Sequence, residues 1–231
     1  LAIVRRLLEL DYRVATFSRS RTPEIDQLSR QDGVRERFDY ESLDAKDTNA
    51  LTKFVERVSE HFGRIDVLVN NAASIIVGKF EKFTYDDLIS TLHVNLISSY
   101  MLSLHVIKKM KEKKNGVIVN IISGVANIGL PFLTLYGIGK SSLRAFSESI
   151  SVELKDDNID VIMVSPGAMN TAQEKKQKLI GIEKNPYDHM KKASPDIVAK
   201  KVFKKIKKKE TLIEFSLKTK LFELLQLMSF N

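Results

Sequence analysis

A tyrosine and a lysine stand four residues apart in the segment YGIGK, as Tyr136 and Lys140. On a helix this spacing places both side chains on one face, so that they can meet at one site. An ammonium about 4 Å from a phenol, at an effective dielectric constant of about 20, favours the phenolate by about 4 kcal/mol. The phenol pKa would then fall by roughly 3 units, from about 10 toward 7, which suits proton transfer at neutral pH. Without further context, the spacing also fits a helix pair that has no chemical role.

Helical and strand patterns alternate along the chain and predict the elements that position this pair. Strands separated by helices indicate a parallel sheet, and the run at 65–73 lacks alternation, as expected of a strand buried on both faces. We therefore predict one α/β domain over residues 1–231, a Rossmann-like, doubly wound parallel sheet with helices on both faces. Expected helices cover 1–10, 23–29, 48–62 with Thr48 as N-cap and Gly63 as terminator, 84–113 and 134–157; expected strands cover 13–18, 34–38, 65–73, 116–122 and 159–167.

Small, polar or glycine-bearing segments follow several of the expected strands. In parallel sheets of this kind, ligands bind beyond the carboxyl ends of the strands. These segments would converge on one rim and form a bed for an extended ligand. They are SRSR at 18–21, LDA at 43–45, NNAA at 70–73, IISG at 121–124 and SPGAMNT at 165–171.

Composition excludes several classes of site. The 231 residues include no cysteine, which rules out disulfides and thiolate metal sites, and 43% are hydrophobic, as in globular proteins. Four scattered histidines (His61, His93, His105 and His189) show no ligand spacing, so we expect no metal site. No apolar run approaches the roughly 18–20 residues of a membrane span, and no signal peptide is visible. The default expectation is a cytoplasmic protein.

Lysines at 108–114 and 200–209 supply much of the net charge of +8. On helices these lysines alternate with apolar residues, which is typical of a solvated face. Docking to an acidic partner, such as a carrier protein, or peripheral association with an anionic membrane surface remains an alternative. Nucleic-acid binding is not expected, because no aromatic residues interleave with the lysines.

Spacing connects the Tyr–Lys pair to further residues. Ser123 ends a strand 13 residues before Tyr136 (136 − 123), and Asn95 lies 28 residues before Ser123 (123 − 95). With NNAA at 70–73 and VSPGAMNT at 164–171, in this order, the chain resembles the short-chain dehydrogenase/reductase family from residue 1 to about 200. The resemblance implies a reductase that transfers hydride between a nicotinamide cofactor and a carbonyl or secondary alcohol.

By this resemblance, four side chains carry the chemistry. Tyr136 would protonate the carbonyl oxygen, and Lys140 would lower the Tyr136 pKa and bind the nicotinamide ribose. Ser123 would hold the carbonyl oxygen, and Asn95 would anchor a water that links Lys140 to solvent. The alternatives are purely structural roles: Ser123 could cap the end of a strand, and Asn95 could be a polar group at a helix kink.

The resemblance also assigns residues to the cofactor. Ala73 stands where the family usually has glycine, which is a mild departure. The residues expected at the adenine are Asp44 and Ala45, those beside the adenosine ribose are Asn71, Ala72 and Ala73, and those at the nicotinamide are Pro166, Gly167, Met169 and Thr171, together with Tyr136 and Lys140.

NADP(H) is favoured over NAD(H). Family members that prefer NAD carry a carboxylate at the end of the second strand, where this chain has Ser18, followed by Arg19 and Arg21. A guanidinium binds a 2′-phosphate bidentately, whereas a carboxylate would repel it. Solvent-facing loop arginines are the alternative, more so for Arg21.

In this family a first strand and a glycine-rich turn, TGxxxGxG, precede the first helix. Leu1 falls where that turn would end. We expect this strand and turn to exist in the protein before Leu1. The region after Thr171 falls where the family keeps a lid over the substrate, and 211–230 resembles a last strand followed by a short amphipathic helix.

The expected function is an NADP(H)-dependent reductase of carbonyls or dehydrogenase of secondary alcohols that acts on a small molecule. Alternatives are a 3-oxoacyl thioester reductase that meets an acidic carrier protein, and a non-catalytic NADP(H)-binding sensor. A membrane-surface protein using the terminal helix is a third. The resemblance also implies a homodimer or homotetramer.

Overall fold

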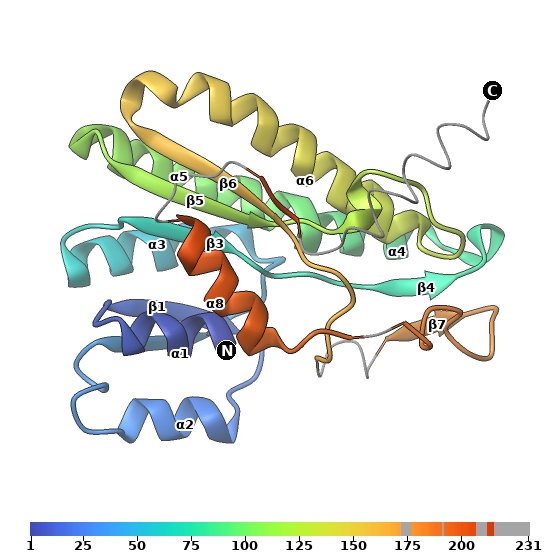
Figure 1. Cartoon of the computed structure of the whole chain (residues 1–231), viewed down its shortest axis with the longest axis horizontal. Coiled ribbons are helices and arrows are strands. Elements are labelled where there is room, and N and C mark those ends of the chain that lie inside the picture. Colours follow the sequence, from blue (N-terminus) through green and yellow to red (C-terminus); the bar gives the residue numbers. More distant parts are fainter. Residues whose placement is uncertain (172–176, 191, 207–211, 215–231) are drawn as a thin grey trace.

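The computed structural model describes residues 1–171, 177–190, 192–206 and 212–214 (Figure 1). Seven α-helices are described: α1 (Ala2–Glu9), α2 (Pro23–Arg30), α3 (Thr48–Phe62), α4 (Tyr85–Leu92), α5 (Ser98–Lys113), α6 (Thr134–Glu153) and α8 (Pro195–Ile206). The strands are β1 (Val14–Ser18), β2 (Phe38–Ser42), β3 (Val67–Asn70), β4 (Ile76–Gly78), β5 (Gly116–Ile121), β6 (Ile159–Ser165), β7 (Lys178–Ile180) and β8 (Leu212–Glu214).

All described strand pairs are parallel, so the predicted α/β class is confirmed. Strands β3, β5, β6 and β8 form one four-stranded sheet in the order β3-β5-β6-β8, and β1 pairs with β2. A further pair, β4 with β7, was not predicted. Its strands are three residues each, too short to leave a periodic pattern in the sequence.

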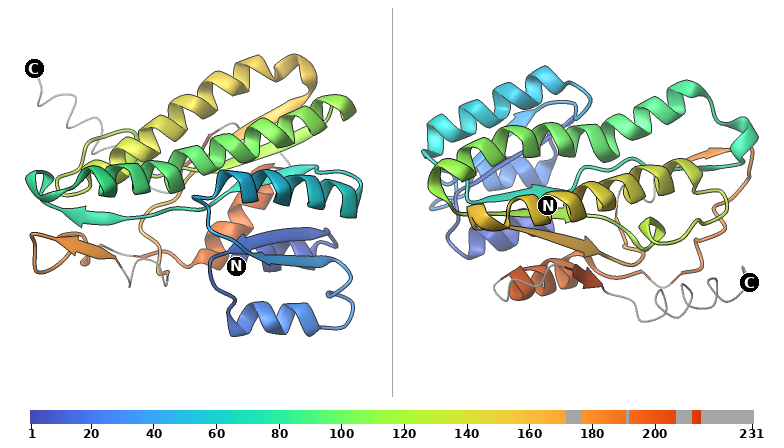
Figure 2. Two further views of the ribbon diagram at one scale, coloured as in Figure 1. Left: turned by 180° about the vertical axis from the view of Figure 1, so that it is seen from behind. Right: turned by 90° about the horizontal axis from the view of Figure 1, so that it is seen from above.

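Helices cover both faces of the sheet (Figures 1 and 2). On one face, α3 and α5 pack with the sheet into an apolar cluster that includes Leu51, Val106 and Ile118, each at most 1% exposed. On the other face, α1 and α2 pack against β1 and β2. Helix α8 adds Val198 and Val202 against β5 and β6. Burial of these surfaces is the main stabilising term of such a fold.

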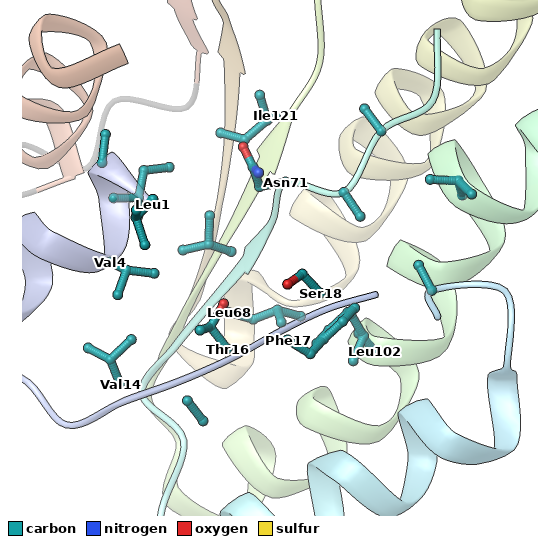
Figure 3. Close-up of a pocket in the computed structure, with 18 of the residues that line it drawn as sticks. Leu1, Val4, Val14, Thr16, Phe17, Ser18, Leu68, Asn71, Leu102 and Ile121 are labelled. Atoms are coloured by element: carbon teal, nitrogen blue, oxygen red, sulfur yellow. The ribbon is translucent and has the colours of Figure 1, made fainter. Parts of the chain in front are cut away.

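The sheet is divided between β1 and β3. Among the described residues β1 pairs with β2 and β3 pairs with β5, which leaves the other edge of each strand without a strand partner. We call the space between these edges the strand slot. A cavity of about 1250 Å³ fills it, and Val14, Thr16 and Leu68 from the two strands line it (Figure 3). Apolar clusters cover both faces of β3, as predicted: Leu68 packs on the α3 and α5 side, and Val67 and Val69 pack on the α8 side. The open edge at the slot leaves these residues half-buried.

Several predicted boundaries are corrected. The expected strand at 34–38 is wrong: Gly33 has φ +72°, Val34 lies in a turn, and the strand is β2, which begins at Phe38. The N-cap of α3 is Asp47, not Thr48, because the Asp47 carboxylate accepts the Ala50 N–H at 3.0 Å. Gly63 ends α3 in the left-handed conformation, as predicted.

The two long predicted helices are interrupted or shortened. The expected helix at 84–113 is one continuous run of α4, a π-helical turn over His93–Ile97, and α5. Helix α6 ends at Glu153 and a 3₁₀ turn covers Lys155–Asp157, where the sequence predicts helix to 157. The predicted last strand is β8, and the helix expected after it lies outside the described residues.

We predict that, in a polypeptide of residues 1–231 alone, the slot is visible in amide hydrogen exchange. In a parallel sheet, successive N–H groups of a strand point to alternate neighbours, so about half of the β3 amides face the slot. These should exchange roughly tenfold faster or more than the amides of β5, which has a strand on each side. Exchange followed by mass spectrometry of peptides covering 67–70 and 116–121 measures this. Equal protection of the two strands would contradict the prediction.

Candidate functional site

Ser123 and Tyr136 meet at the carboxyl end of β5. The strand ends at Ile121, and Ser123 follows it as the N-cap of a 3₁₀ turn over Gly124–Ala126. The chain then returns and begins α6 at Thr134, which places Tyr136 in the first turn of that helix. A hydrogen bond joins Ser123 and Tyr136. The structure therefore brings this predicted pair together. Ser123 also has the structural role given above as the alternative, since it caps the turn that follows the strand end.

Lys140 is buried beneath this pair. Its side chain is 1% exposed, and Nζ donates to the backbone carbonyl of Ile121 at 2.6 Å. Nζ lies 5.9 Å from the centre of the Tyr136 ring. Tyr136 and Lys140 thus share one face of α6, as the four-residue spacing predicts.

The pKa values of the pair differ from the sequence-based prediction. Burial raises the Tyr136 pKa above its usual value, and the hydrogen bond with Ser123 opposes that effect. Burial also lowers the Lys140 pKa, to about 8. The prediction that Lys140 pulls the Tyr136 pKa down in the free protein is therefore wrong. Both groups lose hydration, and loss of hydration penalises their charged forms.

Asn95 connects helix α6 to the segment after β3. It is completely buried in the π-helical turn. Its Oδ1 accepts the Ser74 N–H at 2.6 Å, and its Nδ2 donates to the Ser74 carbonyl at 2.9 Å. A Cβ added at Gly139, next to Lys140, would lie 2.8 Å from the Asn95 Cβ. Asn95 is therefore packed directly against α6 and clamps Ser74, while also lying at the helix irregularity.

Most of the residues predicted for the cofactor share one cavity, which is the cavity of the strand slot. It extends past the carboxyl ends of β1, β3 and β5 (Figure 3). The four catalytic candidates do not themselves line it, but Val94 and Ile121 beside them do. The predicted residues that line it are Ser18, Arg19, Asp44, Ala45, Asn71, Ala72, Ala73, Pro166, Met169 and Thr171.

Gly167 and Arg21 do not line this cavity. Gly167 is exposed, and an added Cβ would meet nothing within 4 Å. Arg21 forms an ion pair with Asp26 (2.5 Å), donates to Ser29 and lies over the Tyr40 ring. Its charge is therefore already partnered.

Sequence reasoning missed three features of the site. Tyr40 contacts Ser18 through their hydroxyl groups at 3.0 Å, and Ser74 is the partner of Asn95. Lys178 forms an ion pair with Asp87, which is 91 residues away in the chain. The motif Thr84-x-x-Asp87 is a capping-box signature and could have pointed to Asp87.

Among the described residues, no group of three or more histidine, aspartate or glutamate side chains is placed to hold a metal ion. None of the helices in the described part of the chain is long and apolar enough to cross a bilayer.

Comparison with known proteins identifies relatives. The family profile described as "short chain dehydrogenase" matches residues 1–179. An uncharacterized oxidoreductase of Thermotoga maritima is 33% identical over 160 residues, which are 69% of this chain and 62% of that protein. A 3-oxoacyl-[acyl-carrier-protein] reductase of Buchnera aphidicola is 37% identical over 129 residues, covering 56% and 53%. The matched region is thus less than two thirds of either relative.

Solved structures show the same fold. A short-chain dehydrogenase from Streptomyces avermitilis superposes with a TM-score of 0.86 at 25% identity, covering 99% of this chain and 87% of that one. An alcohol dehydrogenase from Thermococcus sibiricus, solved with 5-hydroxy-NADP, superposes with a TM-score of 0.78 at 24% identity, covering 94% and 89%.

The burial of Lys140 gives a testable dependence of stability on pH. In the unfolded chain its pKa returns to 10.5, so between pH 8 and 10.5 the unfolded state binds more protons than the folded state. The free energy of unfolding should therefore rise with pH across this window, by up to about 3 kcal/mol from this residue. Lys140→Met should abolish that contribution.

Urea unfolding of both proteins at pH 8 and pH 10.5 measures it. Other groups that titrate in the window contribute equally to both proteins, so the difference between the two pH dependences isolates Lys140. Parallel pH dependences would contradict the prediction.

Proposed function

The chain belongs to the short-chain dehydrogenase family, and on that premise we propose that it is an NADP(H)-dependent oxidoreductase that interconverts a carbonyl and a secondary alcohol. The observation that carries the proposal is the Ser123–Tyr136 hydrogen bond directly above the buried Lys140, at the carboxyl end of a central parallel strand. This is the place where open parallel sheets bind their ligands.

The cavity fits an extended dinucleotide. Its lining runs from Ser18 and Arg19 at the end of β1, past Asn71, to Thr171 after β6. Leu1 and Ala2 also line it, so the N-terminal end of α1 opens onto the cavity. Free N–H groups of a helix N-terminus favour a phosphate group. When bound, the nicotinamide ring supplies or accepts the hydride.

The chain's own residues hold and move the proton. The raised Tyr136 pKa keeps the phenol protonated, as a donor to a carbonyl oxygen must be. The Ser123 hydroxyl lies beside it and can donate to the same oxygen. Lys140, with a pKa of about 8, is near balance between its charged and neutral forms at neutral to mildly alkaline pH. It can therefore return a proton to Tyr136, and Asn95 holds the neighbouring segment in place.

A dinucleotide-binding sensor without catalysis is the less supported alternative. A sensor needs the cavity but has no need of a proton donor hydrogen-bonded to Ser123 above a buried lysine. Burial of an amine costs free energy because the amine loses its hydration. A protein that only binds the dinucleotide would gain nothing from a lysine buried in this way.

Preference for NADP(H) is proposed on the basis of Ser18 and Arg19. Both line the cavity at the end of β1, and Ser18 stands where a carboxylate would repel a 2′-phosphate. Arg21, which the sequence also suggested, is paired with Asp26 and contributes less. Arg19 is therefore the principal candidate for the phosphate contact.

We also propose that a strand preceding Leu1 occupies the strand slot. Two parallel strand edges face the slot, and apolar side chains such as Val14 and Leu68 line it. Exposed strand edges are templates for a further strand. A strand between β1 and β3 would join the two sheets into one. In a polypeptide that carries such a strand, the exchange experiment described for β3 should then show protection of β3 equal to that of β5.

The substrate class follows from the relatives as a proposal. The Buchnera relative is named as a 3-oxoacyl-[acyl-carrier-protein] reductase, and exposed lysines at the end of α5 offer a surface for an acidic carrier protein. Oligomerisation is proposed through α5 and α6, whose exposed apolar residues include Tyr100, Ile138 and Val152.

Tyr136→Phe should lower kcat by at least about 100-fold, because the general acid is removed while the ring remains. The dissociation constant for NADPH, measured by fluorescence titration of the complete protein, should stay within roughly threefold. Tyr85→Phe is the matched control, since Tyr85 is an exposed tyrosine of α4 outside the cavity lining. Turnover that survives in Tyr136→Phe would refute the proposed mechanism.

Arg19→Ala should weaken NADPH binding about tenfold, equivalent to about 1.4 kcal/mol, and leave NADH binding within about twofold. Arg30→Ala makes the same charge change at an exposed residue outside the cavity lining. Titration of each variant with both cofactors measures the effect. Equal loss for NADPH and NADH, or no loss for either, would remove Arg19 from the 2′-phosphate contact.

A further inference from the structure

Residues 177–190, which we call the lid segment, pair with strand β4. This strand follows residues 71–74, which we call the cofactor segment because the first three are predicted to bind the cofactor. Within it, β7 pairs with β4 in parallel register, with Val77 opposite Leu179. The Lys79 N–H donates to the Ile180 carbonyl at 3.1 Å. A Cβ added at Gly78 would lie 2.5 Å from the Ile180 carbonyl oxygen, so the two strands approach as closely as glycine allows.

An ion pair between Lys178 and Asp87 also connects the lid segment to helix α4. Lys178 Nζ lies 2.8 Å from Asp87 Oδ1. The other carboxylate oxygen, Oδ2, accepts the backbone N–H and the hydroxyl of Thr84, which completes the capping box of α4. Asp87 is held in one orientation by helix α4, and its side chain is 10% exposed, whereas that of Lys178 is 61% exposed. The rigid partner is therefore the carboxylate, and the lysine is the movable part.

This pair belongs to the functional cavity. Both Lys178 and Asp87 line it, as does Thr171 at the start of the connection to the lid segment. Strand β4 begins two residues after Ser74, which Asn95 clamps. The Gly78 N–H also donates to the Phe132 carbonyl, four residues before Tyr136. Strand β4 thus links the lid segment to both the cofactor segment and the loop that precedes the catalytic helix.

A second contact lies farther along the lid segment. The Tyr187 hydroxyl donates to the Pro131 carbonyl at 3.0 Å. The lid segment is therefore tied at both ends, by Lys178 to α4 and by Tyr187 to the loop before α6. Between them, Gly181 turns the chain in the left-handed conformation (φ +66°).

We propose that Lys178 is a positioning residue that, by pairing with Asp87, holds the lid segment at the edge of the cavity. It would thereby raise the affinity for cofactor and substrate without taking part in the chemical step. The Lys178 ammonium is already paired with Asp87, so we expect it to influence binding by fixing the position of β7 and not by contacting the ligand. The affinity readouts rest on the proposed function, whereas the position of the lid segment can be measured independently of it.

Lys178→Met tests this in the complete protein, because it removes the charge and keeps most of the side-chain bulk. We expect the KM for the carbonyl substrate and the Kd for NADPH to rise roughly threefold to fivefold, as for loss of a partly exposed ion pair, with kcat changed less than about twofold. Amide exchange of a peptide covering 177–182 should become faster. Lys178→Arg should restore all three quantities.

Two control variants isolate the ion pair. Lys184→Met removes a charge from an exposed lysine of the same segment, one that pairs with no acidic group in the described part of the chain, and should change nothing. Thr84→Ala removes the cap of α4 but leaves Asp87 to pair with Lys178. It should lower thermal stability without raising the Kd for NADPH.

Unchanged exchange of 177–182 in Lys178→Met would overturn the proposal whether or not the protein turns over a carbonyl. Faster exchange with unchanged NADPH affinity would also overturn it, because the fastening would then have no effect on the cavity. Normal exchange in Lys178→Arg with KM still raised would mean that Lys178 contacts the substrate directly, which also refutes a positioning role. If no carbonyl is reduced at all, exchange and NADPH affinity still decide the proposal.

Discussion

The hydrogen bond from Lys140 Nζ to the Ile121 carbonyl joins the catalytic helix to the central strand of the sheet. A buried amine needs a partner, since an unpaired one would carry the full desolvation penalty. The carbonyl at the end of β5 satisfies that need and fixes the rotation of α6 about its axis. Tyr136, one turn earlier on the same face, is thereby placed beside Ser123, which follows the same strand end. The position of Tyr136, the proposed proton donor, therefore depends on where β5 ends.

A second constraint ties the cofactor side to this helix. Asn95 is completely buried, clamps the backbone of Ser74 through both of its amide atoms, and packs against Gly139. Glycine at 139 is needed because a methyl group there would overlap the Asn95 side chain. The π-helical turn that carries Asn95 shifts the register between α4 and α5, and such turns occur frequently at functional sites. The segment after β3 and the catalytic helix are thus positioned by one side chain.

Local spacing predicted much of this site, and tertiary contacts supplied the rest. The four-residue helical spacing predicts that Tyr136 and Lys140 meet. That Ser123 joins them is implied by the family resemblance, because a strand end alone does not determine which helix it faces. The direction of the Tyr136 pKa shift does not follow, because it depends on burial by segments distant in sequence. The predicted start of β2 is wrong for a related reason. Val34 is apolar and buried, as a strand residue would be, but it lies in a turn. The strand itself is formed by Phe38–Ser42. The ion pair of Asp87 with Lys178 could not be predicted either, because no local pattern relates two residues 91 positions apart.

The strand slot and the proposed cofactor site are parts of one continuous cavity, and this links folding to binding. The walls that a further strand would cover, such as Val14 and Leu68, continue directly into the rim formed by Ser18 and Asn71. A strand that closes the slot would order the ends of β1 and β3, and with them the residues at that rim. The entropic cost of ordering these residues would then be met during folding and would not reduce the free energy of dinucleotide binding. Preorganisation raises affinity in this way. Stability of the sheet and affinity for the cofactor should therefore rise together.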